Sequence, residues 1–167
     1  MQIEMTIKGL MVDPITNTPI VILRNDDGQR ILPIWVGIYE ANAIALQIEN
    51  VATPRPMTHD LLRNVIQDLK ATVERIVVCD VQDTTYYALI YLNRNGESMA
   101  IDARPSDAIA LAIRVGAPIY ATDSVLDRAG VIPDSDQEEK LSVFRQFVNS
   151  LDVELEGPNG PPPDERS

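Results

Sequence analysis

A chain of 167 residues with 45% hydrophobic and 23% charged residues has the length and composition of one globular domain. Its net charge of −11 argues against a general nucleic-acid coat protein, because a strongly acidic surface repels polyphosphate. No apolar run approaches the ~20 residues of a membrane-spanning helix and the first residues lack a secretory-signal pattern, so we expect a cytoplasmic protein that does not cross a membrane.

The first half of the chain predicts three strands followed by two helices. The predicted elements are strands at 3–7, 19–24 and 30–36 and helices at 40–49 and 57–69. An Asn-Asp-Asp-Gly turn joins the second and third strands into a hairpin. Thr58 is the expected N-cap of the second helix.

The second half predicts a similar succession of strands and helices. The predicted elements are strands at 73–81, 85–92, 97–103 and 119–121, and helices at 105–115, between Asp123 and Gly130, and at 137–150. Gly116 is expected to end the first of these helices, and Asp123 to cap the second.

The composition changes towards the C-terminus. Eleven acidic and only four basic residues follow Thr122, so most of the negative charge lies in this region. We expect one domain over 1–133, an acidic helical extension over 134–156 and a disordered proline-rich tail over 157–167.

Two stretches of the chain look like copies of one unit. Aligning residues 43–46 with residues 108–111 matches a hairpin, a further strand and an alanine-rich helix in each half. Consecutive hairpins argue against a doubly wound parallel sheet. The sequence therefore predicts an α+β fold of internally duplicated hairpin–strand–helix units, with a mostly antiparallel sheet and packed alanine-rich helices.

Common cofactor and metal signatures are absent from the sequence. Neither GxGxxG nor GxxxxGK[ST] occurs. His59 is the only histidine, so a histidine-rich zinc site cannot form within one chain, and any metal would have to bind carboxylates. Cys79, the only cysteine, lies in an apolar strand and is interpreted as a structural thiol.

Three long segments make the chain resemble a known family. The stretches LPIWVGIYEANAIAL, RPMTHDLLRNVI and IDARPSDAIALAIRVGAPIY, in this order and spacing, are similar to the bifunctional nuclease domain family of bacteria and plants. The resemblance covers roughly residues 1–130 and leaves the acidic C-terminal region outside it. It implies a compact α+β domain, often oligomeric, in a family named for cleavage of both RNA and DNA. It carries over no set of catalytic residues.

A nuclease must place a nucleophile in line with a phosphodiester and stabilise the charge that develops on its oxygens. Carboxylates that hold Mg²⁺ or Mn²⁺ can do both. Four acids near the ends of predicted elements are candidate metal ligands: Glu40, Asp60, Asp102 and Asp107. Asp60 and Asp102 are also candidate catalytic residues.

Basic side chains near these acids complete the candidate site. His59 is a candidate general base or ligand, because histidine titrates near neutral pH. Arg104 is a candidate catalytic clamp for a phosphate oxygen. Arg55 and Arg63 form a candidate basic lip that would bind phosphate.

Each candidate also has a structural interpretation. Asp107 lies where a helix N-terminus attracts negative charge, and Pro105 suits the first helical position. Asp102 could pair with Arg104, and the residues after Thr58 could serve helix capping alone. Both interpretations stay open at the level of sequence.

Two functions follow from these observations. One is a divalent-metal-dependent nuclease, a hydrolase acting on RNA, DNA or both. The alternative is a non-catalytic oligomeric interaction or regulatory module, whose acidic region from residue 134 onward contacts a basic protein. In either case we expect a homodimer, the commonest closed assembly, with Trp35 as a core or subunit-interface anchor rather than a base-stacking platform. A small ligand bound between the repeats is a third possibility that no cofactor motif favours.

Overall fold

The structure is a computed structural model that describes residues 1–132. Its strands are β1 (Gln2–Val12), β2 (Pro19–Asn25), β3 (Ile31–Trp35), β4 (Ala71–Gln82), β5 (Thr85–Arg94), β6 (Glu97–Ala103) and β7 (Ile119–Thr122). Its helices are α1 (Ile38–Ile48), α2 (Thr58–Asp68), α3 (Pro105–Val115) and α4 (Asp123–Ala129). None of these helices has the length and apolar composition needed to span a bilayer.

Every strand and helix predicted within the described residues is present, with small differences at the ends. The predicted helix over 137–150, the acidic extension over 134–156 and the tail over 157–167 lie outside the described residues.

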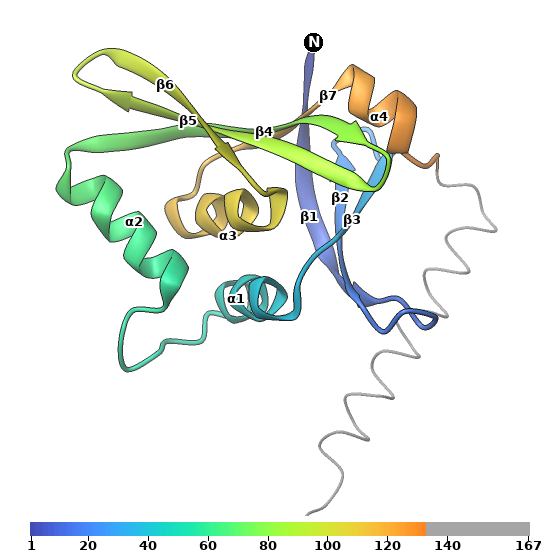
Figure 1. Ribbon diagram of the computed structural model, residues 1–167, viewed down its shortest axis with the longest axis horizontal. Coiled ribbons are helices and arrows are strands. Elements are labelled where there is room, and N and C mark those ends of the chain that lie inside the picture. The colour runs from blue at the N-terminus through green and yellow to red at the C-terminus, as the bar shows by residue number, and fades with distance from the viewer. Residues whose placement is uncertain (133–167) are drawn as a thin grey trace, which may run out of the picture. The chain divides into compact units, whose positions relative to one another are not determined.

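The seven strands form one sheet in the order β3-β2-β1-β7-β4-β5-β6 (Figure 1). Neighbouring strands are antiparallel, except that β4 and β7 run parallel. The predicted α+β class with a mostly antiparallel sheet is therefore confirmed. Each half of the sheet is a three-stranded meander whose last strand leads into a helix, α1 or α3. The internal duplication stays a prediction.

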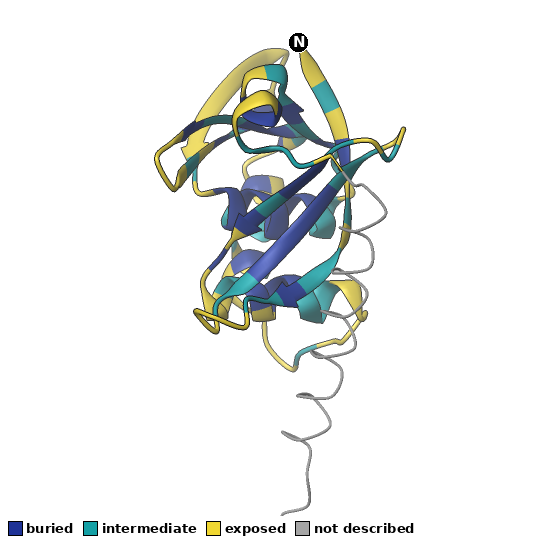
Figure 2. Ribbon diagram, turned by 90° about the vertical axis from the view of Figure 1, so that its right-hand side faces the viewer, coloured by how far each residue is buried: buried dark blue, intermediate teal, exposed yellow. Residues whose placement is uncertain are grey.

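Helix α3 lies at the centre of the core. It contacts α1, α2, β4 and β5, and its Ala108, Ala110 and Ala112 are completely buried. Alanine allows this because its small side chain lets neighbouring backbones approach closely. In Figure 1, α1, α2 and α3 lie together on one side of β4, β5 and β6. Figure 2 shows the buried residues concentrated in the central helices and in the strands that cross in front of them.

The sheet curls until two strands that are distant in its order meet. The Tyr86 hydroxyl on β5 donates a hydrogen bond to the Pro33 carbonyl on β3 at 3.2 Å. Helix α4 contacts β3, β4 and β7, and so bridges the two halves of the curled sheet.

Two predicted N-caps are wrong by one residue. The N-cap of α2 is Met57 and not Thr58, and the Met57 backbone N–H donates to the Asp60 carboxylate at 3.0 Å. The N-cap of α4 is Thr122 and not Asp123, and the Thr122 hydroxyl accepts a backbone hydrogen bond at 3.3 Å. Asp60 and Asp123 each lie inside the first turn of their helix, where the helix dipole favours a negative charge.

Candidate functional site

Three helices carry an acid at the same place in their first turn. Glu40 in α1, Asp60 in α2 and Asp107 in α3 are each the third residue of their helix. Negative charge is favourable there because the first backbone N–H groups have no partner within the helix. All three carboxylates also bond basic side chains, so helix initiation alone does not explain them.

Asp107 is the centre of a network that joins the starts of the three helices. Its Oδ1 lies 2.9 Å from His59 Nε2, and its Oδ2 accepts a hydrogen bond from Arg104 Nε at 2.8 Å. Arg104 Nη2 donates in turn to Glu40 Oε1 at 2.9 Å. We call Glu40, His59, Arg104 and Asp107 the junction.

The junction favours the charged form of Asp107. Burial by itself raises the pKa of Asp107, but hydrogen bonds from His59 and Arg104 outweigh burial and the pKa is lowered. The same bond to Asp107, helped by Glu40, raises the pKa of Arg104. A fixed carboxylate therefore lies between an imidazole and a permanent cation.

His59 and Arg104 both have groups that these bonds leave unused. A neutral His59 that donates from Nε2 to Asp107 keeps Nδ1 able to accept a proton. The Arg104 side chain is 68% exposed, and its Nη1 makes no hydrogen bond within the described residues. That end of the guanidinium is available to an anion.

Asp60 is engaged by structural bonds. Arg114 Nε donates to Asp60 Oδ1 at 2.8 Å, and the Arg114 side chain is only 3% exposed. Arg114 also donates to the carbonyls of Ala110 and Ala43 at 2.8 and 2.9 Å, so it links α1, α2 and α3. The hydrogen bond from Met57 lowers the pKa of Asp60 most, with Arg114 adding to it against burial.

Arg114 is absent from the residues that the sequence predicts for the site. A signal was nevertheless present, because it is the only charged residue in the long apolar run from Ala108 to Val115. Such a residue must reach solvent or find a buried partner. The sequence gives no means of telling which of these occurs.

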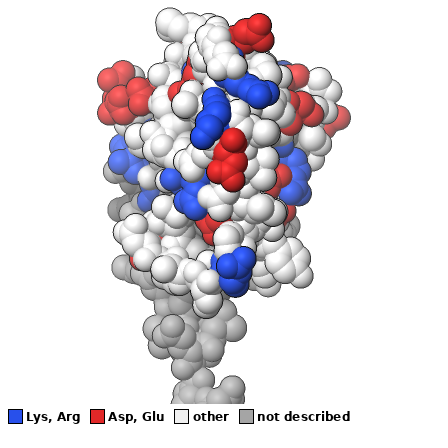
Figure 3. All heavy atoms as spheres, turned by 90° about the vertical axis from the view of Figure 1, so that its left-hand side faces the viewer, with Lys and Arg blue, Asp and Glu red and all other residues white. Residues whose placement is uncertain are grey.

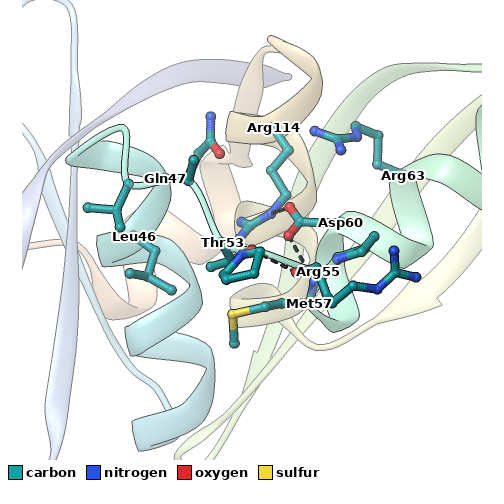
Figure 4. A pocket seen from close by; sticks show the side chains of 12 residues that line it. Leu46, Gln47, Thr53, Arg55, Met57, Asp60, Arg63 and Arg114 are labelled. Atoms are coloured by element: carbon teal, nitrogen blue, oxygen red, sulfur yellow. Dashed lines mark hydrogen bonds and ion pairs between the residues drawn. The ribbon is translucent and has the colours of Figure 1, made fainter.

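A pocket of about 340 Å³ lies beside the Asp60–Arg114 pair, where Figure 4 shows the Arg114 side chain extending to Asp60. Its other charged lining residues are Arg55, from the loop between α1 and α2, and Arg63. Within the described residues the Arg55 guanidinium has no partner, and Arg63 makes one bond, from Nε to Asn64 at 3.3 Å. Because Arg114 neutralises Asp60, the pocket carries an excess of positive charge that suits an anion.

The first turn of α2 separates this pocket from the junction. His59 bonds Asp107 in the junction, whereas the next residue, Asp60, lines the pocket. The predicted phosphate-binding residues Arg55 and Arg63 thus lie together, and Arg104 lies apart from them in the junction.

Asp102 lies away from the junction. Its neighbours in β6, Ile101 and Ala103, pair with the core residues Ile90 and Ala88 of β5. Side chains alternate along a strand, so Asp102 points to the opposite face of the sheet from the core that α3 fills.

The four predicted metal ligands therefore do not converge on one point. Within the described part of the chain, no group of three or more His, Cys, Asp or Glu side chains could hold a metal ion. Arginine side chains bind these carboxylates instead, since Arg104 bonds Glu40 and Asp107, and Arg114 bonds Asp60. A cation would have to displace a guanidinium, so these residues do not fit the predicted Mg²⁺ or Mn²⁺ site as they stand.

Charge on the face beside α2 is mixed rather than continuous. Figure 3 shows Lys and Arg side chains lying among Asp and Glu side chains on this face. An extended basic track of the kind that follows a nucleic-acid backbone is not visible there. Local sites such as the junction and the arginine-lined pocket are the better candidates for phosphate binding.

Trp35 belongs to a different pocket. Its side chain is 48% exposed, and Nε1 donates to Asp13 Oδ2 at 3.2 Å. It lines a pocket of about 650 Å³ together with Tyr86 and Arg128. The adjacent residue Ile34 faces the core, and neighbouring side chains of a strand point to opposite faces, so Trp35 is not a core anchor. Its predicted role at a subunit interface stays a prediction.

An α+β domain that combines a histidine–carboxylate pair, an exposed arginine and an arginine-lined pocket has the groups expected of a protein that handles phosphate esters. Residues 21–134 match the bifunctional nuclease domain, and the chain belongs to that family. The predicted resemblance is confirmed.

Relatives of known sequence occur in bacteria and plants. An uncharacterized protein of Mycobacterium tuberculosis strain H37Rv is 42% identical over 157 residues, which cover 89% of this chain and 94% of that one. Bifunctional nuclease 2 of Oryza sativa subsp. japonica is 28% identical over 149 residues, covering 86% of this chain and 45% of the plant protein. For bifunctional nuclease 2 of Arabidopsis thaliana the identity is 27% over 147 residues, and the shares are 85% and 44%. The chain thus matches less than half the length of these plant relatives.

Proposed function

We propose that this protein is a nuclease that hydrolyses phosphodiester bonds in RNA, DNA or both, with the reacting phosphate at the junction. The observation that carries the proposal is the hydrogen-bonded set of His59, Asp107 and Arg104 in a member of the bifunctional nuclease domain family. Both plant relatives described above bear the name bifunctional nuclease, which supports the same reaction class.

His59 is the proposed general base. Asp107 accepts from Nε2 and so holds the imidazole in the tautomer whose Nδ1 is free for a proton. That proton comes from the water that attacks phosphorus, and the P–O bond to the leaving nucleotide breaks as the new P–O bond forms. The leaving oxygen takes a proton from solvent.

Arg104 is the proposed clamp on the phosphate. Its bonds to Asp107 and Glu40 fix the guanidinium, while Nη1 donates to a phosphate oxygen whose negative charge grows in the transition state. Glu40 is thus a positioning residue. Arg55 and Arg63 are proposed to hold a neighbouring phosphate of the strand in the adjacent pocket, whose size is typical of small-ligand sites.

The proposal is tested with labelled single-stranded RNA and DNA oligonucleotides and purified full-length protein. His59→Gln and Arg104→Ala should each lower the cleavage rate at least ~100-fold, because each removes a group that acts on the reacting atoms. Asp68→Asn, an exposed change in the same helix as His59, is the matched control and should cleave normally. Equal cleavage by all three variants would assign the activity to a contaminant or to another site.

Metal dependence was predicted from the sequence and is tested as a separate arm of the same assay. The proposed mechanism uses only side chains of the junction and water. Cleavage that is lost in EDTA and restored by Mg²⁺ or Mn²⁺ would support the sequence prediction, and it would mean that the carboxylates exchange their arginine partners for the ion. Full cleavage in EDTA would contradict it.

A further inference from the structure

Strand β6 is an open edge of the sheet. It is the last strand in the order and pairs only with β5 (Figure 1). Of its seven residues, all except Ala103 are exposed. Within the described residues, nothing pairs with its outer side. An unpaired edge presents a row of backbone N–H and C=O groups to another strand.

The opposite edge, β3, is closed. Ile31 and Val131 exchange two backbone hydrogen bonds of 2.8 and 2.7 Å. Pro33, in the middle of the strand, has no N–H, and its carbonyl already accepts the Tyr86 hydroxyl. A partner strand can therefore add to the sheet at β6 but not at β3.

Strand β6 also has few of the features that usually protect an edge, since its two charged residues, Glu97 and Asp102, lie near its ends. It contains no Lys, Arg or Pro. Met99 and Ile101 remain 40% and 45% exposed, although they pair with Leu92 and Ile90, which are buried in the core. The apolar face of the sheet thus continues to the edge without a cover among the described residues.

We propose that β6 pairs in antiparallel fashion with β6 of a second copy of this chain, about a two-fold axis through Ala100. The two seven-stranded sheets then become one continuous sheet. In this register Met99 faces the partner's Ile101 on the apolar face, and Ser98 faces the partner's Asp102 on the other. No like charges meet, because Glu97 faces the partner's Ala103.

The sequence of β6 favours this register over its neighbours. Facing residues of two antiparallel strands point to the same side of the sheet. Because side chains alternate, a two-fold axis between two copies of one strand must therefore lie midway between a residue and the same residue of the partner. An axis through Met99 sets Glu97 against the partner's Ile101, an acid against an apolar residue. An axis through Ile101 leaves Asp102 against the partner's Ala100, without a hydrogen-bond donor. The axis through Ala100 avoids both mismatches.

Pairing of this kind stops at two copies. Each sheet in the dimer ends at its own β3, which is closed, so further chains cannot add to it. The Asp102 carboxylate, which has no hydrogen bond or ion pair within a single described chain, gains the partner's Ser98 hydroxyl as a donor. The inference does not rest on the nuclease activity, and it assigns Asp102 to association.

The first test is the mass of the full-length protein in solution by light scattering. We expect two chains for the wild type. Met99→Lys combined with Ile101→Lys places like charges opposite each other, and should raise the dimer dissociation constant at least ~100-fold. Leu61→Lys changes an apolar residue of α2 that is even more exposed, at 56%, and should leave the dimer intact. A monomeric wild type, or a double variant that still dimerises as tightly, overturns the proposal.

The second test fixes the register and does not depend on weakening the dimer. In a Cys79→Ala background, Ala100→Cys should form a disulfide between two chains under mild oxidation, because the axis sets this residue against its own copy. Glu97→Cys, three residues away on the same strand, should not. Cross-linking at Glu97→Cys, or none at Ala100→Cys, would rule out this pairing.

Discussion

Arg114 shows how one side chain can hold three helices in place. It is almost fully buried, and it bonds Asp60 in α2, a carbonyl of α1 and a carbonyl of its own helix. Arg114→Met removes the cation but leaves Asp60 charged and partly buried. We expect the free energy of unfolding, measured with urea, to fall by about 3–5 kcal/mol.

The matched control for Arg114 is Arg94→Met. Arg94 is exposed in the β5–β6 hairpin and has no ion pair within the described residues. Its replacement should change the free energy of unfolding by less than about 0.5 kcal/mol. Similar small losses for both variants would mean that Asp60 relaxes into solvent when Arg114 is removed.

Asp107 should link stability to pH. Its pKa in the folded protein is below the ordinary value, so ionised Asp107 stabilises the fold above the pKa of the unfolded chain. This stabilisation is lost as the pH falls through the folded-state pKa. The difference in unfolding free energy between wild type and Asp107→Asn should therefore be constant near neutral pH and shrink below about pH 4. Urea titrations at several pH values measure it, and a difference that does not vary with pH would contradict the interpretation.

The sequence identified all four junction residues but not the contacts between them. Local patterns placed Glu40 and Asp107 in first helical turns. Their connection through Arg104 depends on how α1 lies against α3, and the His59–Asp107 contact joins residues 48 apart. The position of Asp102 outside the junction could be predicted from the sequence, because strand alternation sets it on the opposite face from the apolar Ile101.

Helices α1, α2 and α3 each end next to a residue in the left-handed region. These are Asn50, Lys70 and Gly116, with φ of 54°, 63° and 72°. Glycine adopts this conformation without a steric penalty, whereas a side chain makes it unfavourable. Substitutions at the ends of α2 and α3 should therefore have opposite effects on stability.

Lys70→Gly should stabilise the protein by about 1 kcal/mol, and Gly116→Ala should destabilise it by about 1 kcal/mol. A Cβ at Gly116 meets no atom within 4 Å, so the second effect is conformational rather than steric. Thermal unfolding of both variants provides the measurement. A change of the same sign in both would contradict the assignment of these helix ends.

At the level of elements, hydrophobic periodicity and turn residues were sufficient to predict the helices and strands within the described residues. Asn95 and Gly96, both at positive φ, form the tight turn of the β5–β6 hairpin, and an Asn-Gly pair between two apolar strands is typical of such a turn. The strand order was not predictable in the same way. The four-residue β7 inserts between β1 and β4, and only tertiary packing selects that place.

For the whole molecule, the net charge of −11 restricts how nucleic acid can bind. If Arg55, Arg63 and Arg104 are the only phosphate contacts, log K for a single strand should fall with log salt with a slope of about −2. Fluorescence anisotropy of a labelled oligonucleotide at several salt concentrations gives this slope. Arg55→Gln should reduce its magnitude by about 0.7, and an unchanged slope would remove Arg55 from the binding surface.

The most direct test of the account compares cleavage by Asp107→Asn and Asp102→Asn on the same oligonucleotide. Both variants remove one carboxylate charge, but only Asp107 belongs to the junction. We predict that Asp107→Asn lowers the cleavage rate at least ~100-fold, because His59 and Arg104 lose the group that orients them. Asp102→Asn should cleave like the wild type. Equal rates for the two variants, or a loss confined to Asp102→Asn, would contradict the assignment of the junction as the catalytic centre.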